Sequence, residues 1–190
     1  MAEAALSRTT NFENHAAALA AAERVLALAK EGVRGKQAAA KSADAGQHAL
    51  HGLAWLATYV EAIRQMLGWA KRMSGEGRFG EMEGLLLDVA FGEYLAQIAG
   101  GIPMSQVEMV RLGQLGVSPE EAMRFAADRH VADLIARGGS EEVKARIAEL
   151  IADQPGVTTF GDSGLDETHS AMREQMRKFA EDKVLPNAHD

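Results

Sequence analysis

Cysteine is absent from the 190 residues, which excludes disulfide bonds, thiolate catalysis and cysteine-ligated zinc. Aromatic residues make up only 5% of the chain, so a core must come mainly from aliphatic side chains on helices. No apolar run reaches the roughly 18 residues of a membrane span, and the N-terminus lacks the basic and apolar stretches of a secretory signal. The composition therefore predicts an all-α, soluble protein, and a chain without cysteine is compatible with the reducing cytoplasm.

Acidic residues outnumber basic ones, 27 to 20, which gives the chain a formal net charge of -7. A negatively charged chain is repelled by nucleic-acid phosphates and by anionic lipid. We therefore expect neither nucleic acid nor a membrane as a partner. A chain of 190 residues is long enough for one sizeable core, or for one core with an appended arm.

The first helix is predicted to start at Asn11 or Asn14, either of which can act as an N-cap, and to run to about Lys30. One face of this segment repeats apolar residues at helical spacing, namely Leu19, Ala22, Leu26 and Ala29. Gly32 and Gly35 follow, and glycine commonly ends a helix. We therefore expect the helix to stop there.

The second helix is predicted over residues 36–73, which contain no proline, with a break near Gly46 or Gly52 as the alternative. It carries two apolar stripes at spacings of three and four. The first stripe comprises Leu53, Leu56, Val60, Ile63, Leu67 and Ala70. The second comprises Trp55, Tyr59, Ala62, Met66, Trp69 and Met73. Because only a narrow polar strip remains, this helix is expected to be central, with neighbours on both apolar faces.

A glycine-rich turn over 74–80 leads into a third helix, predicted over 81–99. A turn this short makes consecutive helices antiparallel neighbours. Gly84, Asp88 and Gly92 recur on one flank at spacings of four. Because glycine costs a helix about 1 kcal/mol relative to alanine, we interpret the two glycines as a place where another backbone packs closely.

Three shorter helices are predicted next, over 103–115, 118–137 and 140–154. Pro103 stands where a first helical residue is expected. Ser118 precedes a proline and two glutamates, which is the pattern of an N-cap with a capping box.

The best linker in the chain is the segment 155–164, because it is rich in proline and glycine. Its strand-like run over 157–160 is too short to form a sheet alone. We therefore divide the chain into a helical domain over 1–154, the linker over 155–164 and a closing amphipathic helix within 165–190. The apolar face of that helix comprises Leu165, Met172, Met176 and Phe179. The expected fold is a multi-helix bundle around a central antiparallel helical hairpin.

Two groups of residues have the spacing of metal ligands. Asp44, His48 and His51 would share one helix face, and imidazole with carboxylate suits zinc or iron. The competing interpretation, a polar edge on an Ala-rich helix, is favoured, because carboxylate-bridged di-iron bundles need Glu-x-x-His pairs and the sequence has none. Asp166 and His169 form a weaker pair, since acidic residues are expected at a helix start. We assign no metal ligand.

Asp88 and Glu93 lie in a strongly apolar helix, where burial can raise the pKa of a carboxyl group for acid or base catalysis. The favoured interpretation is that they meet Arg64, Lys71 or Arg72 of the antiparallel neighbour, or reach solvent. No other residue pattern supplies a converging catalytic partner.

The aromatic stripe that contains Trp55, Tyr59 and Trp69 is compatible with a ligand cavity, but core packing is the usual role of such side chains. The chain has no glycine-rich dinucleotide motif after a strand, no Walker lysine motif and no serine-nucleophile signature. We therefore assign no catalytic and no cofactor-binding residue.

Residues 172–188 read Met-Arg-Glu-Gln-Met-Arg-Lys-Phe-Ala-Glu-Asp-Lys-Val-Leu-Pro-Asn-Ala. This segment resembles the opening helix of the flavin-dependent acyl-CoA dehydrogenase family. Two segments of the preceding helices are Trp55-Leu-Ala-Thr-Tyr-Val-Glu-Ala-Ile-Arg and Gly84-Leu-Leu-Leu-Asp-Val-Ala-Phe-Gly-Glu-Tyr94. With their surroundings, these segments look like the long N-terminal extension found in the branch of that family that oxidises (2S)-methylsuccinyl-CoA.

The resemblance implies a parent enzyme that uses FAD to remove a proton from the α carbon and a hydride from the β carbon of a CoA thioester. Its product would be mesaconyl-CoA in the ethylmalonyl-CoA pathway, with electrons passed to an electron-transferring flavoprotein. In this family the glutamate base, the flavin contacts and the CoA pocket lie beyond the first helix. None of them maps onto a position here, so the segment alone is expected to be inactive and to bind no cofactor.

The resemblance also implies partners for the extension, namely its own dehydrogenase body and further copies in a homo-oligomer. Two hypotheses describe its task. In the first, it is a structural or oligomerising module of the enzyme. In the second, it is a separable helical module that binds a partner protein and has no enzymatic role.

Overall fold

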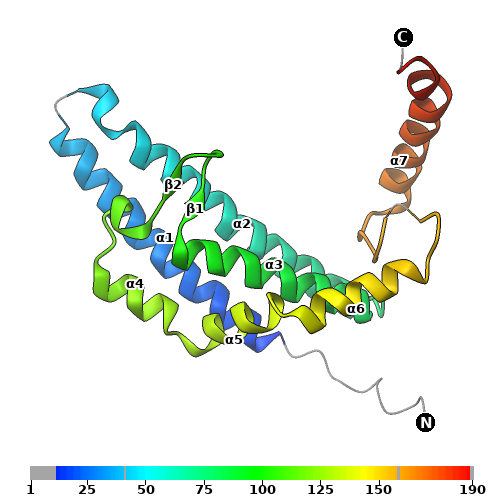
Figure 1. The fold of residues 1–190 in the computed structure, drawn as a ribbon, viewed down its shortest axis with the longest axis horizontal. Helices are drawn as coiled ribbons and strands as arrows, with labels where there is room; N and C mark the ends of the chain where they lie inside the picture. Colours follow the sequence, from blue (N-terminus) through cyan, green and yellow to red (C-terminus); the bar gives the residue numbers. More distant parts are fainter. Residues whose placement is uncertain (1–11, 41, 158, 189–190) are drawn as a thin grey trace.

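The computed structural model describes residues 12–40, 42–157 and 159–188, and these form a helical bundle with one helix appended (Figure 1). The all-α prediction is confirmed: the described residues contain a single sheet, which has two short strands. The helices and strands are α1 (Glu13–Ala39), α2 (Gln47–Gly75), α3 (Glu81–Gly100), β1 (Ile102–Pro103), β2 (Met109–Val110), α4 (Pro119–Ala126), α5 (Arg129–Gly138), α6 (Glu141–Ala152) and α7 (Glu167–Phe179). Short 3-10 turns lie at Ala43–Gly46, Leu112–Leu115 and Leu185–Asn187, and a π-helical turn at Ala180–Val184.

The start of the first helix differs from the prediction. Helix α1 has Phe12 at its N-cap position, where no side chain caps the helix. Asn14 lies inside the helix, and its amide donates a hydrogen bond of 2.6 Å to Asp133 of α5. The other predicted cap, Asn11, lies outside the described residues.

The end of the first helix also differs from the prediction, because α1 continues through Gly32 and Gly35. A β carbon at Gly32 would overlap the backbone of Leu115 and Gly116. This glycine therefore marks a close approach between two backbones, and not a helix end.

The predicted helix over 36–73 is interrupted, since residues 36–39 belong to α1 and α2 begins only after Gly46. The break thus falls at one of the two predicted alternatives. Gly52, the other alternative, lies inside α2, where a β carbon would come within 2.6 Å of the Val110 side chain. That glycine lets the hairpin of β1 and β2 pack against α2.

Helix α2 packs against α1 and α3, as expected of a central helix, but the predicted cover of its second apolar stripe is incomplete. The first apolar stripe is buried except for Leu53, which is half-buried. In the second stripe Tyr59 and Met73 are buried, whereas four members are half-buried: Trp55, Ala62, Met66 and Trp69. Helix α3 runs antiparallel to α2 (Figure 1), and the Tyr59 hydroxyl donates a hydrogen bond of 2.7 Å to Gln97.

The close packing predicted beside Gly92 is present, and the partner is α5. A β carbon at Gly92 would lie 2.8 Å from the α carbon of Gly138 and from the carbonyl oxygen of Leu134. A β carbon at Gly138 would overlap the carbonyl of Asp88. Gly84 has more space, since its β carbon would lie 3.7 Å from Phe79.

A β-hairpin replaces the helix predicted over 103–115. Ile102 pairs with Val110 and Pro103 with Met109 in antiparallel register. Two features favour the hairpin: Gly101 has a φ of 140°, and Ile102 and Val110 are both only 1% exposed. Both anchors are β-branched residues that suit strands, and their burial as a cross-strand pair outweighs the helix-start signal of Pro103.

The helix predicted over 118–137 is divided in two, although its predicted start is confirmed. The Ser118 hydroxyl accepts the N–H of Glu121 at 3.3 Å. The division arises because the Asp128 carboxylate accepts the N–H groups of His130 and Val131, and so caps a new helix, α5. Helix α6 begins as predicted, with Ser140 as its N-cap.

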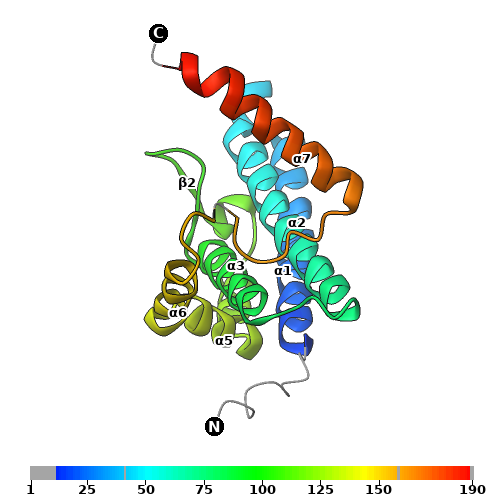
Figure 2. The same cartoon turned by 90° about the vertical axis from the view of Figure 1, so that its right-hand side faces the viewer.

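Helix α7 forms where the closing amphipathic helix was predicted and stands apart from the bundle in Figure 1, whereas in the view of Figure 2 it crosses in front of α2. Its N-cap is Asp166, which accepts the N–H of His169 at 2.8 Å. The strand-like run over 157–160 forms no strand in its described residues. Within the parts of the chain that the structure covers, no helix is long and apolar enough to cross a membrane.

The contact between α3 and α5 predicts the effect of two glycine substitutions. Gly138→Ala should lower the free energy of unfolding by about 1–3 kcal/mol, because the added methyl group meets the backbone of α3. Gly68→Ala is the control, since a β carbon at this position in α2 has open space. It should raise stability by about 0.5–1 kcal/mol. Urea unfolding followed by circular dichroism measures both, and equal midpoints for the two variants would contradict the contact.

Candidate functional site

The candidate metal ligands do not come together in the structure. Asp44 accepts a hydrogen bond of 3.0 Å from Gln47, and His51 accepts one of 2.9 Å from the indole of Trp55. Nε2 of His48 lies 3.4 Å from a glutamine amide of the turn after β2. Among the described residues, no three histidine, aspartate or glutamate side chains form a group that could hold a metal ion.

The two carboxylates of α3 have other partners than the basic residues of α2 that the sequence suggested. Oδ1 of Asp88 lies 2.9 Å from Nε2 of His15 and 3.0 Å from a guanidinium nitrogen of Arg137. Glu93 pairs with Lys144 of α6 at 3.3 Å. Glu93 also reaches solvent, as the alternative prediction had it, with its side chain 48% exposed. The predicted ion pairs with α2 are wrong because the flank of α3 that carries these carboxylates faces α5 and α6, a fact of helix packing that periodicity does not reveal.

The pair of His15 and Asp88 is the most buried polar contact between helices of the bundle. His15 is 6% exposed, and its ring meets Phe91 edge-on with centroids 4.9 Å apart. Since Asp88 also accepts from Arg137, one carboxylate connects α1, α3 and α5. Sequence reasoning had noted Asp88 as a carboxylate in an apolar helix, but not its histidine partner, which lies 73 residues away.

A second polar cluster holds residues 161–164, which we call the docked turn, against the end of α2 and the start of α3. The Asp162 carboxylate receives two hydrogen bonds from the guanidinium group of Arg78, at 2.6 and 2.7 Å. The N–H of Gly164 donates to the same carboxylate at 2.8 Å. The indole N–H of Trp69 donates to the carbonyl oxygen of Asp162 at 3.0 Å. Asp162 is therefore fixed through both its side chain and its backbone.

Glu83 connects the docked turn to α3. This carboxylate is 7% exposed, which is unusual for glutamate. One of its oxygens accepts the N–H of Asp162 at 2.5 Å, and the other accepts the N–H of Gly80 at 2.9 Å. Two hydrogen bonds from backbone N–H groups offset the cost of burying the side chain.

Both glycines of the docked turn have backbone angles that favour glycine. Gly161 has a φ of 74° and Gly164 a φ of 69°. They also lie close to the bundle: a β carbon would come within 3.1 Å of Glu83 at the first position and 3.0 Å of Trp69 at the second. The glycines that the sequence identified as a linker thus form a turn that packs on the bundle.

An open cleft lies between the end of α2 and the start of α7. Its volume is about 470 Å³, and it is lined by Arg72, Glu76, Arg78, Gly164, Leu165, Asp166 and His169. The N–H of Gly164, with Arg78, holds the pKa of Asp162 below its usual value, and the N–H of His169 does the same for Asp166. A flavin ring needs a flat, largely apolar slot, and this charged, open cleft does not fit it. We assign no flavin contact to these residues.

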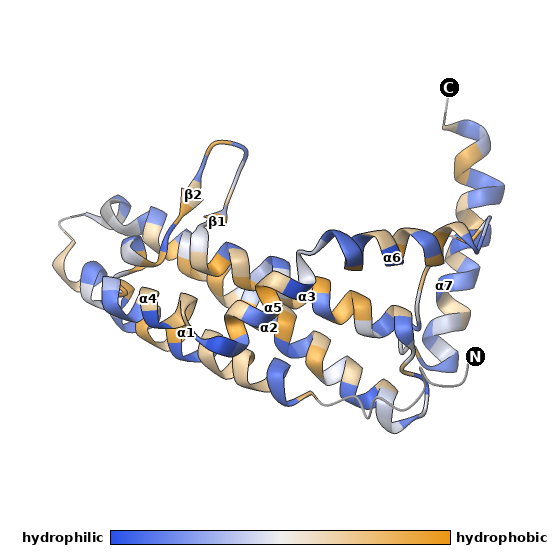
Figure 3. Ribbon diagram, turned by 60° about the horizontal axis from the view of Figure 1, so that its bottom comes forward, coloured by the Kyte–Doolittle hydropathy of each residue, from blue (hydrophilic) through white to orange (hydrophobic). Residues whose placement is uncertain are grey.

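Helix α7 presents three of the four residues of its predicted apolar face to solvent, whereas the fourth, Leu165, precedes the helix and is half-buried. Met172 is 62% exposed, Met176 66% and Phe179 56%. Figure 3 shows apolar residues along this helix while it projects away from the bundle. Side chains of this size on one helix face usually pack against another surface.

The helical bundle, the docked turn and the exposed apolar face of α7 define the class of protein. It is a helical module with an appended amphipathic helix. No protein-family model matches the chain. The chain is 50% identical over 152 residues to (2S)-methylsuccinyl-CoA dehydrogenase of Cereibacter sphaeroides. The match covers 78% of the chain and 26% of that dehydrogenase, so the chain spans about a quarter of the length of the relative. The resemblance recognised from the sequence is thereby confirmed.

The docked turn predicts where proteases will cut. Asp162→Ala removes the contacts with Arg78 and with the N–H of Gly164, so the turn should leave the bundle more often. Cleavage within 153–166 should become at least about fivefold faster, because the net contribution of even one of the three lost hydrogen bonds corresponds to that factor. Asp153→Ala, an exposed aspartate at the end of α6, is the control and should change nothing. Limited proteolysis with mass spectrometry measures both, and equal rates would contradict the docking.

The lowered pKa of Asp162 also predicts a pH dependence of docking. Because the docked state favours the carboxylate, docking is strongest above the ordinary aspartate pKa of about 3.9 and is lost as the pH falls through the lowered value. In a Trp55→Phe background, the fluorescence of Trp69 should report this loss. Asp162→Asn should remove that acid transition, whereas Asp166→Asn should retain it. An unchanged titration in Asp162→Asn would show that another group is responsible.

Proposed function

We propose that this chain is the helical N-terminal part of a flavin-dependent acyl-CoA dehydrogenase that oxidises (2S)-methylsuccinyl-CoA to mesaconyl-CoA in the ethylmalonyl-CoA pathway. One observation carries the proposal: the 50% identity over 152 residues to a dehydrogenase of that name. The lack of cysteine is in keeping with a cytoplasmic enzyme.

The role we propose for the bundle is structural or oligomerising. Its polar groups support this role, because Asp88 and Glu83 are engaged with other parts of the bundle. The exposed apolar face of α7 supports it as well, since such a face gains stability when another domain covers it. FAD, the acyl-CoA substrate and the electron-transferring flavoprotein would be bound by the dehydrogenase body, outside these 190 residues.

The second candidate function is a separable helical module that binds a partner protein and has no enzymatic role. The exposed Met172 and Met176 favour it, because methionine-rich helix faces adapt to varied partners. The two candidates differ in what the dehydrogenase body needs. Only a structural module should affect flavin binding and turnover when it is removed.

Removal of residues 1–154 from the full-length protein tests the choice. If the bundle supports the body, the truncated enzyme should lose bound flavin, turn over substrate at least about tenfold more slowly, or change its oligomeric state, because apolar surface becomes exposed. Flavin absorbance, steady-state kinetics and light scattering measure these three properties. If all three match those of the unmodified enzyme, the bundle is a separable module.

The substrate is tested on the unmodified full-length enzyme. (2S)-Methylsuccinyl-CoA should be oxidised with a kcat/KM at least about tenfold above that of other branched acyl-CoA thioesters, as expected when a pocket discriminates between side chains. The product should be identified as mesaconyl-CoA by mass spectrometry, with electron-transferring flavoprotein as the acceptor. Equal use of several branched thioesters would overturn the substrate assignment while leaving the family assignment in place.

A further inference from the structure

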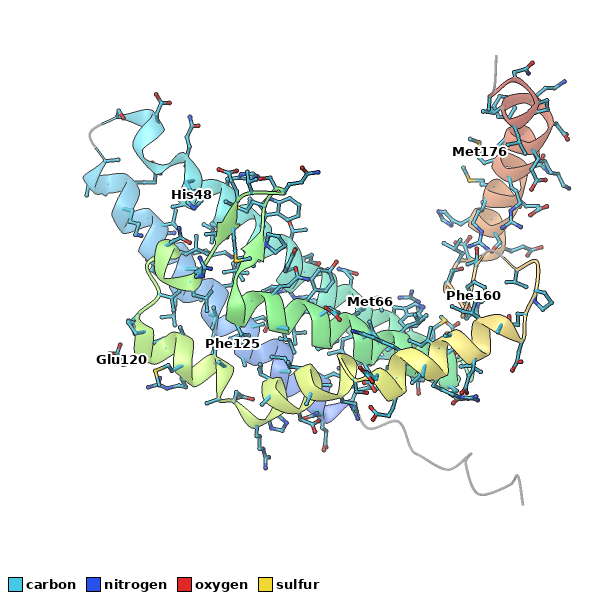
Figure 4. All side chains as sticks on the ribbon, in the orientation of Figure 1. His48, Met66, Glu120, Phe125, Phe160 and Met176 are labelled. Atoms are coloured by element: carbon cyan, nitrogen blue, oxygen red, sulfur yellow. The ribbon has the colours of Figure 1, made fainter. Side chains whose placement is uncertain are left out.

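One flank of the α2–α3 hairpin is apolar but only half covered. From α2, the half-buried members of the second stripe lie there, namely Trp55, Ala62, Met66 and Trp69. From α3, Leu86, Ala90 and Tyr94 are also half-buried. A helix that is apolar on nearly every side, as α3 is, is normally covered on every side. In the view of Figure 4, Met66 lies between the β-hairpin and α7.

The β-hairpin of β1 and β2 bounds this flank at one end. Its base is anchored, since Ile102 is buried and Val110 packs against Gly52. Its tip carries one apolar side chain, Val107, which is 93% exposed among the polar residues Ser105, Gln106 and Glu108, and Met109 of β2 is 42% exposed. An exposed valine on an anchored hairpin is well suited to contact a second surface.

Helix α7 bounds the flank at the other end. The docked turn positions its start, because Gly164 lies against Trp69 and Met73 of α2. Two views show that α7 and the hairpin rise on the same side of the bundle, with the chain end above it (Figures 1 and 3). Of the twelve large apolar side chains that are exposed among the described residues, seven belong to the hairpin or to α7 and the turns after it.

The hairpin, the α2–α3 flank and α7 therefore supply exposed or half-covered apolar side chains on one side of the bundle, and we call this surface the saddle. A second copy of this chain would cover it only through a self-complementary surface, because a two-fold contact uses the same patch on both subunits. The relative supplies a better candidate. About three quarters of its length has no counterpart in this chain, and polypeptide that continues from α7 would start on the side of the saddle.

We propose that the saddle is the contact surface for the dehydrogenase body of the same polypeptide, and that this body covers the hairpin tip and the α2–α3 flank as well as α7. This inference rests on the proposed function and adds the location of the contact. It requires that Val107, far from the chain end in sequence, is shielded in the full-length enzyme.

The lack of cysteine in this chain makes thiol labelling a direct test in the full-length enzyme. Val107→Cys should react at least about tenfold more slowly than Met123→Cys of α4, although Val107 is the more exposed here, at 93% against 71%. Ala62→Cys and Ala57→Cys form a matched pair, because both are half-buried and lie on opposite flanks of α2. Only Ala62→Cys should be shielded further. Labelling of the unsubstituted enzyme measures the reaction of any cysteines in the dehydrogenase body, and this background is subtracted.

The labelling result separates this inference from the proposed function. If Val107→Cys reacts as fast as Met123→Cys in an enzyme that retains flavin and turnover, the saddle assignment is overturned and the proposed function stands. If the full-length protein binds no flavin and oxidises no acyl-CoA, the proposed function fails first.

Cross-linking identifies what covers the saddle. A photoreactive group on Val107→Cys should form links to residues beyond position 190 of the same chain. Mixing isotopically labelled with unlabelled enzyme distinguishes links within a chain from links between chains. Links mainly between chains would assign the saddle to an oligomer contact and would overturn the proposal.

Discussion

The close approach of α3 and α5 is the constraint on which the bundle depends. Gly92 and Gly138 bring the two backbones together at a distance that any side chain would prevent. That approach places Asp88 where it meets both His15 of α1 and Arg137 of α5. Three helices are thereby joined by one half-buried carboxylate, and α2 packs against α1 and α3. Gly92 and Gly138 therefore allow the packing of α3 on α5, although glycine has a low helix propensity.

The docked turn extends the bundle to its appended helix. A flexible linker would leave α7 free to adopt many directions, whereas Asp162 and Glu83 bind the turn to α2 and α3 through side-chain and backbone hydrogen bonds. The docked turn thus places the start of α7, whose N-cap is Asp166, beside the end of α2. The proposed contact with a dehydrogenase body uses this geometry, because the saddle exists only if α7 and the hairpin stand on the same side.

Much of the local structure could be predicted from residue patterns. The apolar stripes of α2, the Ser118 and Ser140 caps and the antiparallel turn between α2 and α3 follow from spacing and capping rules that act over a few residues. The errors share a cause. Gly32 was interpreted as a helix end and Pro103 as a helix start, because each has that meaning in isolation. Tertiary contacts override it: the backbone at Leu115 and Gly116 needs the space at Gly32, and burial of Ile102 and Val110 selects a hairpin.

The sequence by itself determined that the chain is helical, which faces of its helices are apolar, and which enzyme it resembles. The helical class depends on composition, the apolar faces depend on the spacing of apolar residues, and the resemblance depends on the order of residues. Each of these can be read from the sequence without knowing how distant segments pack. Only the tertiary structure decided that Asp88 meets His15, that the linker glycines form a docked turn on Glu83, and that the hairpin and α7 stand on the same side of the bundle. Such contacts join residues 73 or 79 positions apart. Their formation depends on how whole helices pack, and no short pattern in the sequence records it.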